Sequence, residues 1–191
     1  FARGRARTYE AIAIALKSFT RDVFMSPTDA REAREGLTEA HSLVQQFAFN
    51  AAPDADISAP QQLYAEILAW DAAVWSKVAT DDPARSSRAL LDANPSSIGG
   101  VALCPVHRSD GGNPYYPAQP AREGQLGAVV VRLRFDNQGA YLGAGVAASV
   151  GDENLQRNVA AAAATWAYSV DPPDGCRPAE ILYATVIFYM R

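Results

Sequence analysis

Cysteine and histidine are scarce in this 191-residue chain, which holds two of each. The spacings typical of metal sites, C-x-x-C and H-E-x-x-H, do not occur around Cys104, Cys176, His41 or His107. Two cysteines are also too few for a disulfide-rich scaffold. We therefore expect no metal centre and no other cofactor.

An excess of positive charge and a long apolar run are also missing. Lys and Arg number 17 against 21 Asp and Glu, which gives a net charge of −4. This balance argues against nucleic acid as a partner. The longest apolar runs are far shorter than the ~20 residues that a membrane-spanning helix needs, so no membrane span is predicted in these residues. Because the sequence starts at Phe1 rather than Met, we expect that a preceding segment, a signal peptide or a membrane anchor, has been removed.

Catalytic signatures are absent as well. There is no G-x-S-x-G nucleophile turn and no G-x-x-x-x-G-K phosphate loop. Two pairs of carboxylates, Asp54 with Asp56 and Asp81 with Asp82, lie in a loop or at a helix start, where helix capping accounts for them. We therefore expect a protein that is not an enzyme.

What the sequence does contain divides near residues 95–100. Helical periodicity precedes that point and strand alternation follows it, which predicts an α+β fold. We expect a helical bundle over residues 1–98, a linker over 99–112 and a second domain over 113–191. A helix-hairpin repeat of the tetratricopeptide type is an alternative for the bundle, although its sequence period is absent.

Helix starts and helix faces are visible in the first part. Ser26-Pro-Thr-Asp29 and Ser58-Ala-Pro-Gln61 are typical helix starts with serine as the N-cap. His41 falls within a predicted helix and is expected at the surface or half-buried, and a short fourth helix is expected from Asp82 to Leu91. The residues expected on buried helix faces are Tyr9, Ile12, Leu16, Phe19 and Val23, then Leu37, Val44 and Phe47, then Leu63, Ile67, Trp70, Val74 and Val78.

Strand alternation is clear in the second part. In residues 127–135 the odd positions should face a core, whereas the even positions, which include Val130 and two arginines, should form a solvated face. Asp136-Asn-Gln-Gly139 predicts a hairpin turn into a return strand over residues 140–149. Asp152 should cap a helix that packs through Leu155, Val159, Ala162, Ala163 and Trp166.

The last predicted strand covers residues 180–190. Leu182, Ala184, Val186, Phe188 and Met190 should share one face, and Tyr183, Thr185, Ile187 and Tyr189 the other. No sequence follows this strand to cover its edge, so we expect the edge to be open. An open edge offers backbone N–H and C=O groups to an extended peptide.

The second part also carries an ordered set of motifs. They are Tyr116-Pro117, the alternating run from Gly127 to Phe135, Gly139, Ser149-x-Gly151, Leu155, Trp166-x-Tyr168 and the final run from Ala184 to Phe188. This order resembles the C-terminal domain of TonB. The resemblance implies that the helical bundle is followed by a small three-stranded antiparallel sheet packed against one or two helices.

The resemblance further implies a role in periplasmic energy transduction. Domains of this family bind an extended segment, the TonB box, of an outer-membrane transporter by adding it as a strand to the sheet edge. The strand at Thr185 to Tyr189 matches the one that pairs with this segment, and Asn113 to Pro117 match a second contact. The residues expected to bind the partner are Asn113, Pro114, Tyr115, Tyr116, Pro117, Ala184, Thr185, Val186, Ile187, Phe188, Tyr189 and Met190.

The sequence departs from this family in its first half, where a helical domain replaces the membrane anchor and the proline-rich spacer. In addition, Asn113 stands where the best-known member has Gln. Two functions therefore remain open: a TonB-type module that supports transport, and an envelope structural or assembly module that forms a homodimer through its last strand. Both imply a periplasmic location, with or without an inner-membrane anchor in a preceding segment. In that oxidising compartment, Cys104 and Cys176 would either form a disulfide or remain free thiols.

Overall fold

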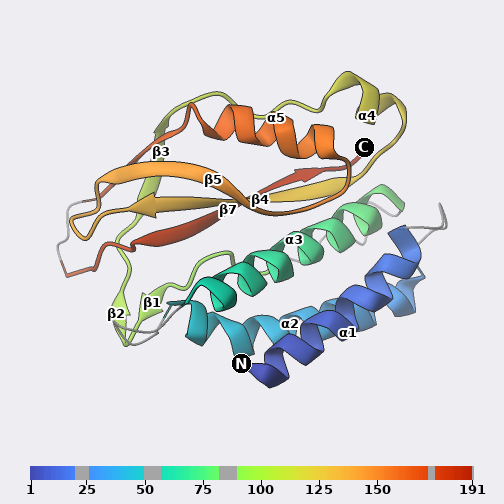
Figure 1. Ribbon diagram of the computed structural model, residues 1–191, viewed down its shortest axis with the longest axis horizontal. Coiled ribbons are helices and arrows are strands. Elements are labelled where there is room, and N and C mark those ends of the chain that lie inside the picture. Colours follow the sequence, from blue (N-terminus) through green and yellow to red (C-terminus); the bar gives the residue numbers. More distant parts are fainter. Residues whose placement is uncertain (20–25, 50–56, 82–89, 172–174, 191) are drawn as a thin grey trace.

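The computed structural model describes residues 1–19, 26–49, 57–81, 90–171 and 175–190. Its elements form layers, with one long helix on each face of a three-stranded sheet, two further long helices outside one of them, and a short helix at the end of the sheet (Figure 1). The predicted α+β class is confirmed. The helices are α1 (Ala2–Phe19), α2 (Pro27–Phe49), α3 (Ser58–Asp81), α4 (Ala118–Arg122) and α5 (Glu153–Ala163).

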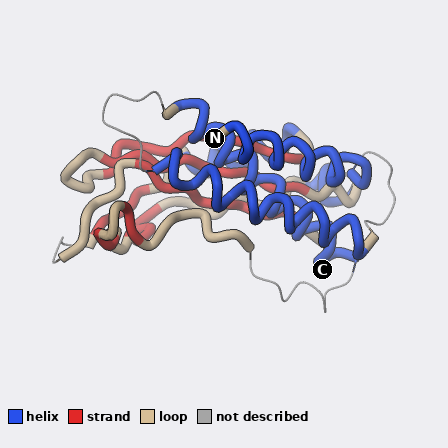
Figure 2. Tube along the Cα trace, turned by 90° about the horizontal axis from the view of Figure 1, so that it is seen from below, coloured by secondary structure: helices blue, strands red, loops and turns tan. Residues whose placement is uncertain are grey.

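The main sheet is antiparallel and has the strand order β5-β4-β7. It consists of β4 (Gly127–Phe135), β5 (Tyr141–Val150) and β7 (Ile181–Phe188). The predicted hairpin joins β4 to β5: the Asp136 carboxylate accepts hydrogen bonds from the N–H groups of Gln138 and Ala140, and Gly139 has a φ of 86°. Seen from below, α1, α2 and α3 lie along the strands in front of the sheet (Figure 2).

Two smaller strand pairs lie outside this sheet. β3 (Val106–Asp110) pairs with β6 (Ala167–Val170), and β1 (Ser97–Ile98) pairs with β2 (Val101–Ala102). Pro105 separates two of these strands, because β2 ends before it and β3 begins after it. Strands β1, β3 and β6 and the short helix α4 were not predicted from the sequence.

Helix α3 is the centre of the molecule, because it separates the outer helices from the sheet. Tyr64 and Ile67 of α3 share a core with Val130 of β4 and Tyr183 of β7. The prediction of a solvated sheet face is therefore wrong for Val130, which α3 covers, whereas Arg132 and its neighbour Arg134 are exposed as expected. A helix that is buried on both sides needs apolar residues all round, which accounts for its weak amphipathic pattern.

The buried face of α1 differs from the predicted one. Tyr9 and Leu16 are 50% and 43% exposed, while Thr8, Ala11 and Ala15 are buried. Small residues bring α1 close to α2: a Cβ added at Gly36 would lie 2.9 Å from the Cβ of Ala11. Close helix approach, rather than side-chain hydrophobicity, therefore decides which face of α1 is buried.

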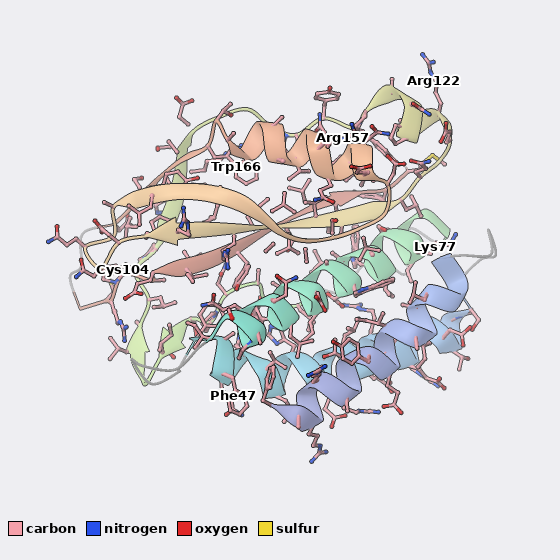
Figure 3. All side chains as sticks on the ribbon, in the orientation of Figure 1. Phe47, Lys77, Cys104, Arg122, Arg157 and Trp166 are labelled. Carbon is pink, nitrogen blue, oxygen red and sulfur yellow. A yellow bond between two sulfur atoms is a disulfide. The ribbon has the colours of Figure 1, made fainter. Side chains whose placement is uncertain are left out.

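Phe47 of α2 is also more exposed than predicted. It lies near the C-terminal end of α2, on the side that faces away from the sheet (Figure 3), and its ring contacts Phe1 with ring centroids 6.1 Å apart. The other two residues expected on the buried face of α2, Leu37 and Val44, are fully buried. The α3 face is buried at Leu63, Ile67 and Val74 and half-buried at Trp70 and Val78.

The predicted helix caps are present at α2 and α5. Ser26 Oγ accepts from the Asp29 N–H at 3.0 Å, and Asp152 Oδ1 accepts from the Asn154 N–H at 2.7 Å. The expectations for Val23, for the helix starting at Asp82 and for the carboxylates of Asp54, Asp56 and Asp82 lie outside the described residues.

Helix α5 packs on the second face of the sheet. Leu155, Val159, Ala163 and Trp166 are buried against Val129, Val131 and Phe188, as the periodicity predicted, whereas Ala162 is half-buried. Trp166 closes this corner (Figure 3), with its indole N–H donating to the Gly112 carbonyl at 2.8 Å. No helix in the described ranges is long and apolar enough to cross a membrane.

Candidate functional site

The outer edge of strand β7 is the candidate functional site. Tyr183 lies opposite Arg132 of β4, yet both its N–H and its C=O bond to a side chain outside the sheet, so they point away from β4. Because backbone direction alternates along a strand, the N–H and C=O of Thr185 and Ile187 also point away from β4. Among the residues that the structure describes, none bonds to these four groups.

Asn94 supplies the side chain that bonds to Tyr183. Its Nδ2 donates to the Tyr183 carbonyl at 2.9 Å, and its Oδ1 accepts from the Tyr183 N–H at 2.7 Å. One carboxamide therefore pairs with both backbone groups of an edge residue, as a residue of a neighbouring strand would. The ring of Tyr183 is buried, and its centroid lies 5.4 Å from that of the Tyr64 ring. This burial raises the pKa of the Tyr183 hydroxyl to about 12.

Buried polar side chains of α2 and α3 hold the backbone immediately before Asn94. The Asp71 carboxylate accepts from the Leu91 N–H at 2.9 Å, and the Nε2 of His41 lies 2.9 Å from the Asp92 carbonyl oxygen. The Tyr64 hydroxyl donates to the carbonyl oxygens of Asp92 and Ala93, at 3.2 and 3.3 Å. The segment from Leu91 to Asn94 is thereby fixed between the helices and the sheet edge.

His41 is buried, which corrects its predicted placement at the surface or half-buried. Besides the Asp92 carbonyl, its Nε2 lies 2.8 Å from the Tyr64 hydroxyl. Burial lowers the pKa of His41, because the charged imidazolium loses its hydration, and the Asp92 carbonyl and the Asp71 carboxylate offset this only in part. The neutral imidazole is therefore the form that this cluster accommodates.

Aromatic rings flank the C-terminal end of β7 on both faces. Trp75 of α3 packs edge-on against Tyr189, with ring centroids 5.1 Å apart. On the α5 side, Tyr116 packs against Phe188 at 5.3 Å, and its hydroxyl donates to the Gln125 carbonyl. A strand added beside β7 would therefore run past an aromatic surface on each face.

The other edge of the sheet, β5, is less suited to strand addition. Its register with β4 shifts twice, so that Leu142 and Ala147 have no partner residue in the ladder. Such bulges twist a strand and interrupt its row of outward backbone groups. Between Tyr183 and Phe188, by contrast, the register of β7 with β4 continues without a shift.

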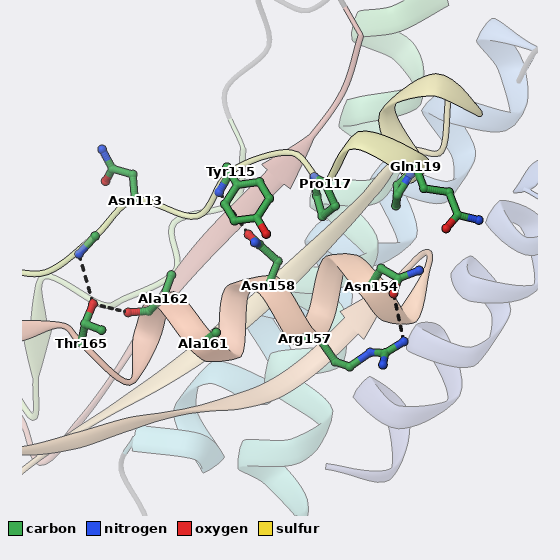
Figure 4. Close-up of a pocket in the computed structure, with 12 residues that line it drawn as sticks. Asn113, Tyr115, Pro117, Gln119, Asn154, Arg157, Asn158, Ala161, Ala162 and Thr165 are labelled. Carbon is green, nitrogen blue, oxygen red and sulfur yellow. Dashed lines mark hydrogen bonds between the residues drawn. The ribbon is translucent and has the colours of Figure 1, made fainter.

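Residues 113–117 contact two different parts of the structure, strand β7 and a groove along α5. Tyr116 reaches β7, but Asn113, Tyr115 and Pro117 line a groove of about 650 Å³ along α5 (Figure 4). Tyr115 is 68% exposed, and its N–H donates to Asn158 Oδ1 at 3.0 Å. The structure thus brings only part of the predicted 113–117 contact to the edge strand.

A disulfide joins Cys104 to Cys176, with the Cα atoms 4.9 Å apart. It lies near the end of the sheet where β7 begins (Figure 3). The N–H of Cys104 donates to the Arg177 carbonyl at 2.9 Å, and the N–H of Arg177 donates to the Ala102 carbonyl at 2.8 Å. The chain before β7 is therefore fastened to the segment that follows Asn94.

Comparison with known proteins identifies the part of the chain that contains this edge. Residues 112–190 match the family model described as the Gram-negative bacterial TonB protein C-terminal. These residues form a TonB C-terminal-like domain. The chain is also similar to the solution NMR structure of the TonB C-terminal domain of Pseudomonas aeruginosa, with 23% identity and a TM-score of 0.32 over 45% of this chain and 85% of that one. No curated protein matches it.

The TonB C-terminal family is an interaction module rather than a family of enzymes. In the described part of this chain, no group of three His, Cys, Asp or Glu side chains is arranged to hold a metal ion. The Nε2 of His107 lies 3.3 Å from Asp171 Oδ2, and both side chains are exposed. These features give no indication of catalytic chemistry.

Several residues at the edge of the TonB-like domain were missed by the sequence reasoning. Asn94 lies outside the matched residues and 89 positions before Tyr183. The only local pattern at this position is the dipeptide Asn94-Pro95, which predicts a turn and not a contact with a strand. Asp71 and Tyr64 lay in a predicted helix, and no local pattern shows that they bond to a segment about 20 to 30 residues further on.

Proposed function

We propose that this protein is a periplasmic interaction module that binds an extended segment of an outer-membrane transporter, or of another envelope protein, by β-strand addition to β7. We further propose that this binding supports energy-dependent transport. The outward backbone groups of Thr185 and Ile187 carry the proposal, because they form an unoccupied ladder edge within the described residues. The TonB-like match of residues 112–190 supports the class of partner.

The chemistry of this edge suits an extended peptide. Main-chain hydrogen bonds to Thr185 and Ile187 would give affinity that depends little on the peptide sequence. Selectivity would come from alternate peptide side chains, which would meet Trp75 and Tyr189 on one face and Tyr116 on the other. We therefore expect the preferred peptides to carry apolar side chains at alternating positions.

A titration followed by amide NMR tests this proposal. The probes are synthetic peptides copied from the TonB boxes of outer-membrane transporters, with a scrambled peptide as control. We expect saturable shifts of the Thr185 and Ile187 amides, together with slower hydrogen exchange at both. A dimer in sedimentation analysis whose β7 amides are already protected, with no response to peptide, would favour the homodimer alternative instead.

A pair of variants isolates the backbone contribution. Ile187→Pro removes an N–H that points away from β4 and so leaves the internal ladder intact. Ile187→Ala is the matched control, because it trims the same side chain, which packs near Ala72 and Ala128, but keeps the N–H. We expect Ile187→Pro to bind peptide at least about tenfold more weakly than Ile187→Ala.

If Ile187→Pro does not fold, the contribution of main-chain hydrogen bonds can be tested by modifying the peptide instead. Backbone N-methylation at successive peptide positions should weaken binding to the wild-type protein in an alternating pattern, because only every second N–H of an added strand faces β7. Uniform effects along the peptide, or none, would contradict strand addition.

A further inference from the structure

We propose that Asn94 is a specificity-determining residue for the peptide-binding edge: its carboxamide occupies the edge at Tyr183 and thereby stops the added strand at Thr185. This inference rests on the proposed function. It assigns to the helical part of the chain a role at the sheet edge, namely setting the register and the length of the bound segment.

The geometry of the contact supports this role. Asn94 both donates to the carbonyl of Tyr183 and accepts from its N–H, at 2.9 and 2.7 Å. A carboxamide is the side-chain group that can do both at once in one plane, whereas a carboxylate only accepts. An added strand would need these same two groups of Tyr183 for its next pair of ladder bonds. Peptide and Asn94 therefore compete for one residue of β7.

Asn94 is also fixed in place, which distinguishes it from a surface side chain that an incoming strand could push aside. The three residues before it are bonded to Asp71, His41 and Tyr64, and all three of these side chains are buried. The residue after it is Pro95, which restricts the backbone of Asn94 to extended conformations. The backbone that carries the carboxamide is thus held in place by bonds to the helical layer.

The consequence for the partner follows from the register of β7. The outward residues of this strand are Ile181, Tyr183, Thr185 and Ile187, and the contact of Asn94 with Tyr183 separates Ile181 from the last two. With Tyr183 occupied, the ladder available to a peptide consists of the N–H and C=O groups of Thr185 and Ile187. A peptide residue placed opposite Tyr183 would gain no main-chain bonds, so the bound segment is short and its register is defined at that end.

The first experiment measures the contact without any peptide. Hydrogen exchange of the Tyr183 amide should become about tenfold faster in Asn94→Ala, the factor expected for the loss of roughly one hydrogen bond. The amide of Ala184, which faces β4, is the internal control and should not change. Asn94→Asp keeps an acceptor for the N–H but loses the donor to the Tyr183 carbonyl, so its rate should lie between those of the wild type and Asn94→Ala. Because a faster rate than in the wild type is still expected, this variant also serves if Asn94→Ala does not fold.

The second experiment combines the Asn94 variants with peptides of two lengths. Each TonB-box peptide is compared with a version lengthened by one residue pair, in one series at its N-terminal end and in another at its C-terminal end, because a strand can add in either orientation. For the wild type we expect no gain in affinity from either extension. In Asn94→Ala, the extension that reaches Tyr183 should tighten binding about tenfold and newly protect the Tyr183 amide.

The outcomes separate this inference from the function on which it rests. Peptide protection of Thr185 and Ile187 with equal gains from extension in the wild type and in Asn94→Ala would overturn the role of Asn94 and leave strand addition standing. A change of Tyr183 exchange when peptide is added to the wild type would do the same, because it means that Asn94 is displaced. No protection of Thr185 or Ile187 in any variant would overturn the proposed function, and the inference with it.

Discussion

The carboxylate of Asp71 lies 3.1 Å from the Nε of Arg34, and it is 1% exposed. This ion pair joins α3 to α2, while the second carboxylate oxygen holds the Leu91 N–H. A buried charge is tolerated only when it is paired and hydrogen-bonded, so the two interactions depend on each other. The pair therefore links helix packing to the position of the segment that ends at Asn94.

Removing Arg34 should be strongly destabilising. In Arg34→Met the Asp71 carboxylate stays buried without its cation, and we expect the free energy of unfolding to fall by about 3 kcal/mol. Asp71→Asn keeps an acceptor for Leu91 and removes the charge, so its loss should be smaller. Urea unfolding followed by circular dichroism measures both. The control is Glu39→Gln, which breaks ion pairs to Arg3 and Arg7 that lie at the surface, where salt bridges contribute about 0–1 kcal/mol. Equal losses for Arg34→Met and Glu39→Gln would contradict this prediction.

Stability should fall in mild acid because of His41. Burial lowers its pKa in the folded state from the usual 6.5, so the unfolded chain binds the proton more readily. The stabilisation is complete above pH 6.5 and is lost as the pH decreases from there toward the lowered value. Melting temperatures recorded between pH 7.5 and pH 5 should show this decrease in the wild type, and a smaller one in His41→Gln. An identical pH dependence in the two proteins would argue against a neutral, buried imidazole.

Reduction of the disulfide should lower stability without unfolding the sheet. Cys104 and Cys176 are 72 positions apart, and closing a loop of that length restricts the unfolded chain by about 4 kcal/mol in the chain-entropy description. The ladder bonds between Arg177 and its neighbours remain, so we expect Cys104→Ser/Cys176→Ser to fold but to unfold at lower urea. Adding a reductant to the wild type should produce the same shift and have no effect on the double variant.

Two glycines of the main sheet should respond in opposite ways to alanine. A Cβ on Gly127 would lie 2.4 Å from the Val150 carbonyl oxygen and 3.0 Å from Leu155, so Gly127→Ala should cost about 2 kcal/mol or more. Nothing lies within 4 Å of a Cβ on Gly145, where alanine should raise stability by about 0.5 kcal/mol. Thermal unfolding of the two variants makes the comparison. Similar effects at both positions would show that β4 and α5 are packed less closely than described.

Local signals predicted the parts of the fold that local chemistry determines. The caps at Ser26 and Asp152, the turn at Asp136 and the alternation of β4 each depend on residues a few positions apart. The prediction of the buried face of α1 was wrong, because it was based on hydrophobicity, which favours Tyr9. The burial of Ala11 depends instead on how closely α2 approaches α1. That distance is a tertiary property, and no periodicity within α1 encodes it.

Of the candidate site, the edge strand could be predicted from the sequence, but the side chain that contacts it could not. The alternation of residues 180–190 indicated a strand, which the structure has at Ile181–Phe188, and the order of motifs indicated its family. The partner of Tyr183 was not predictable, because Asn94 reaches it across 89 residues through a single side chain. The burial of Val130 was missed for the same reason: a half-apolar strand face is covered or solvated depending on whether another element packs on it, here α3.

The disulfide also determines where tension on the sheet would go. β7 begins shortly after Cys176, and the hydrogen bonds of Arg177 align that stretch with residues 102–104. A pull along β7 toward its C-terminal end would put Cys176 under tension, and the disulfide would pass part of this load to Cys104. From there the covalent path runs back along the chain to Asn94 and the bonds that hold its segment to α2 and α3. The helical layer thereby becomes the mechanical anchor of the strand.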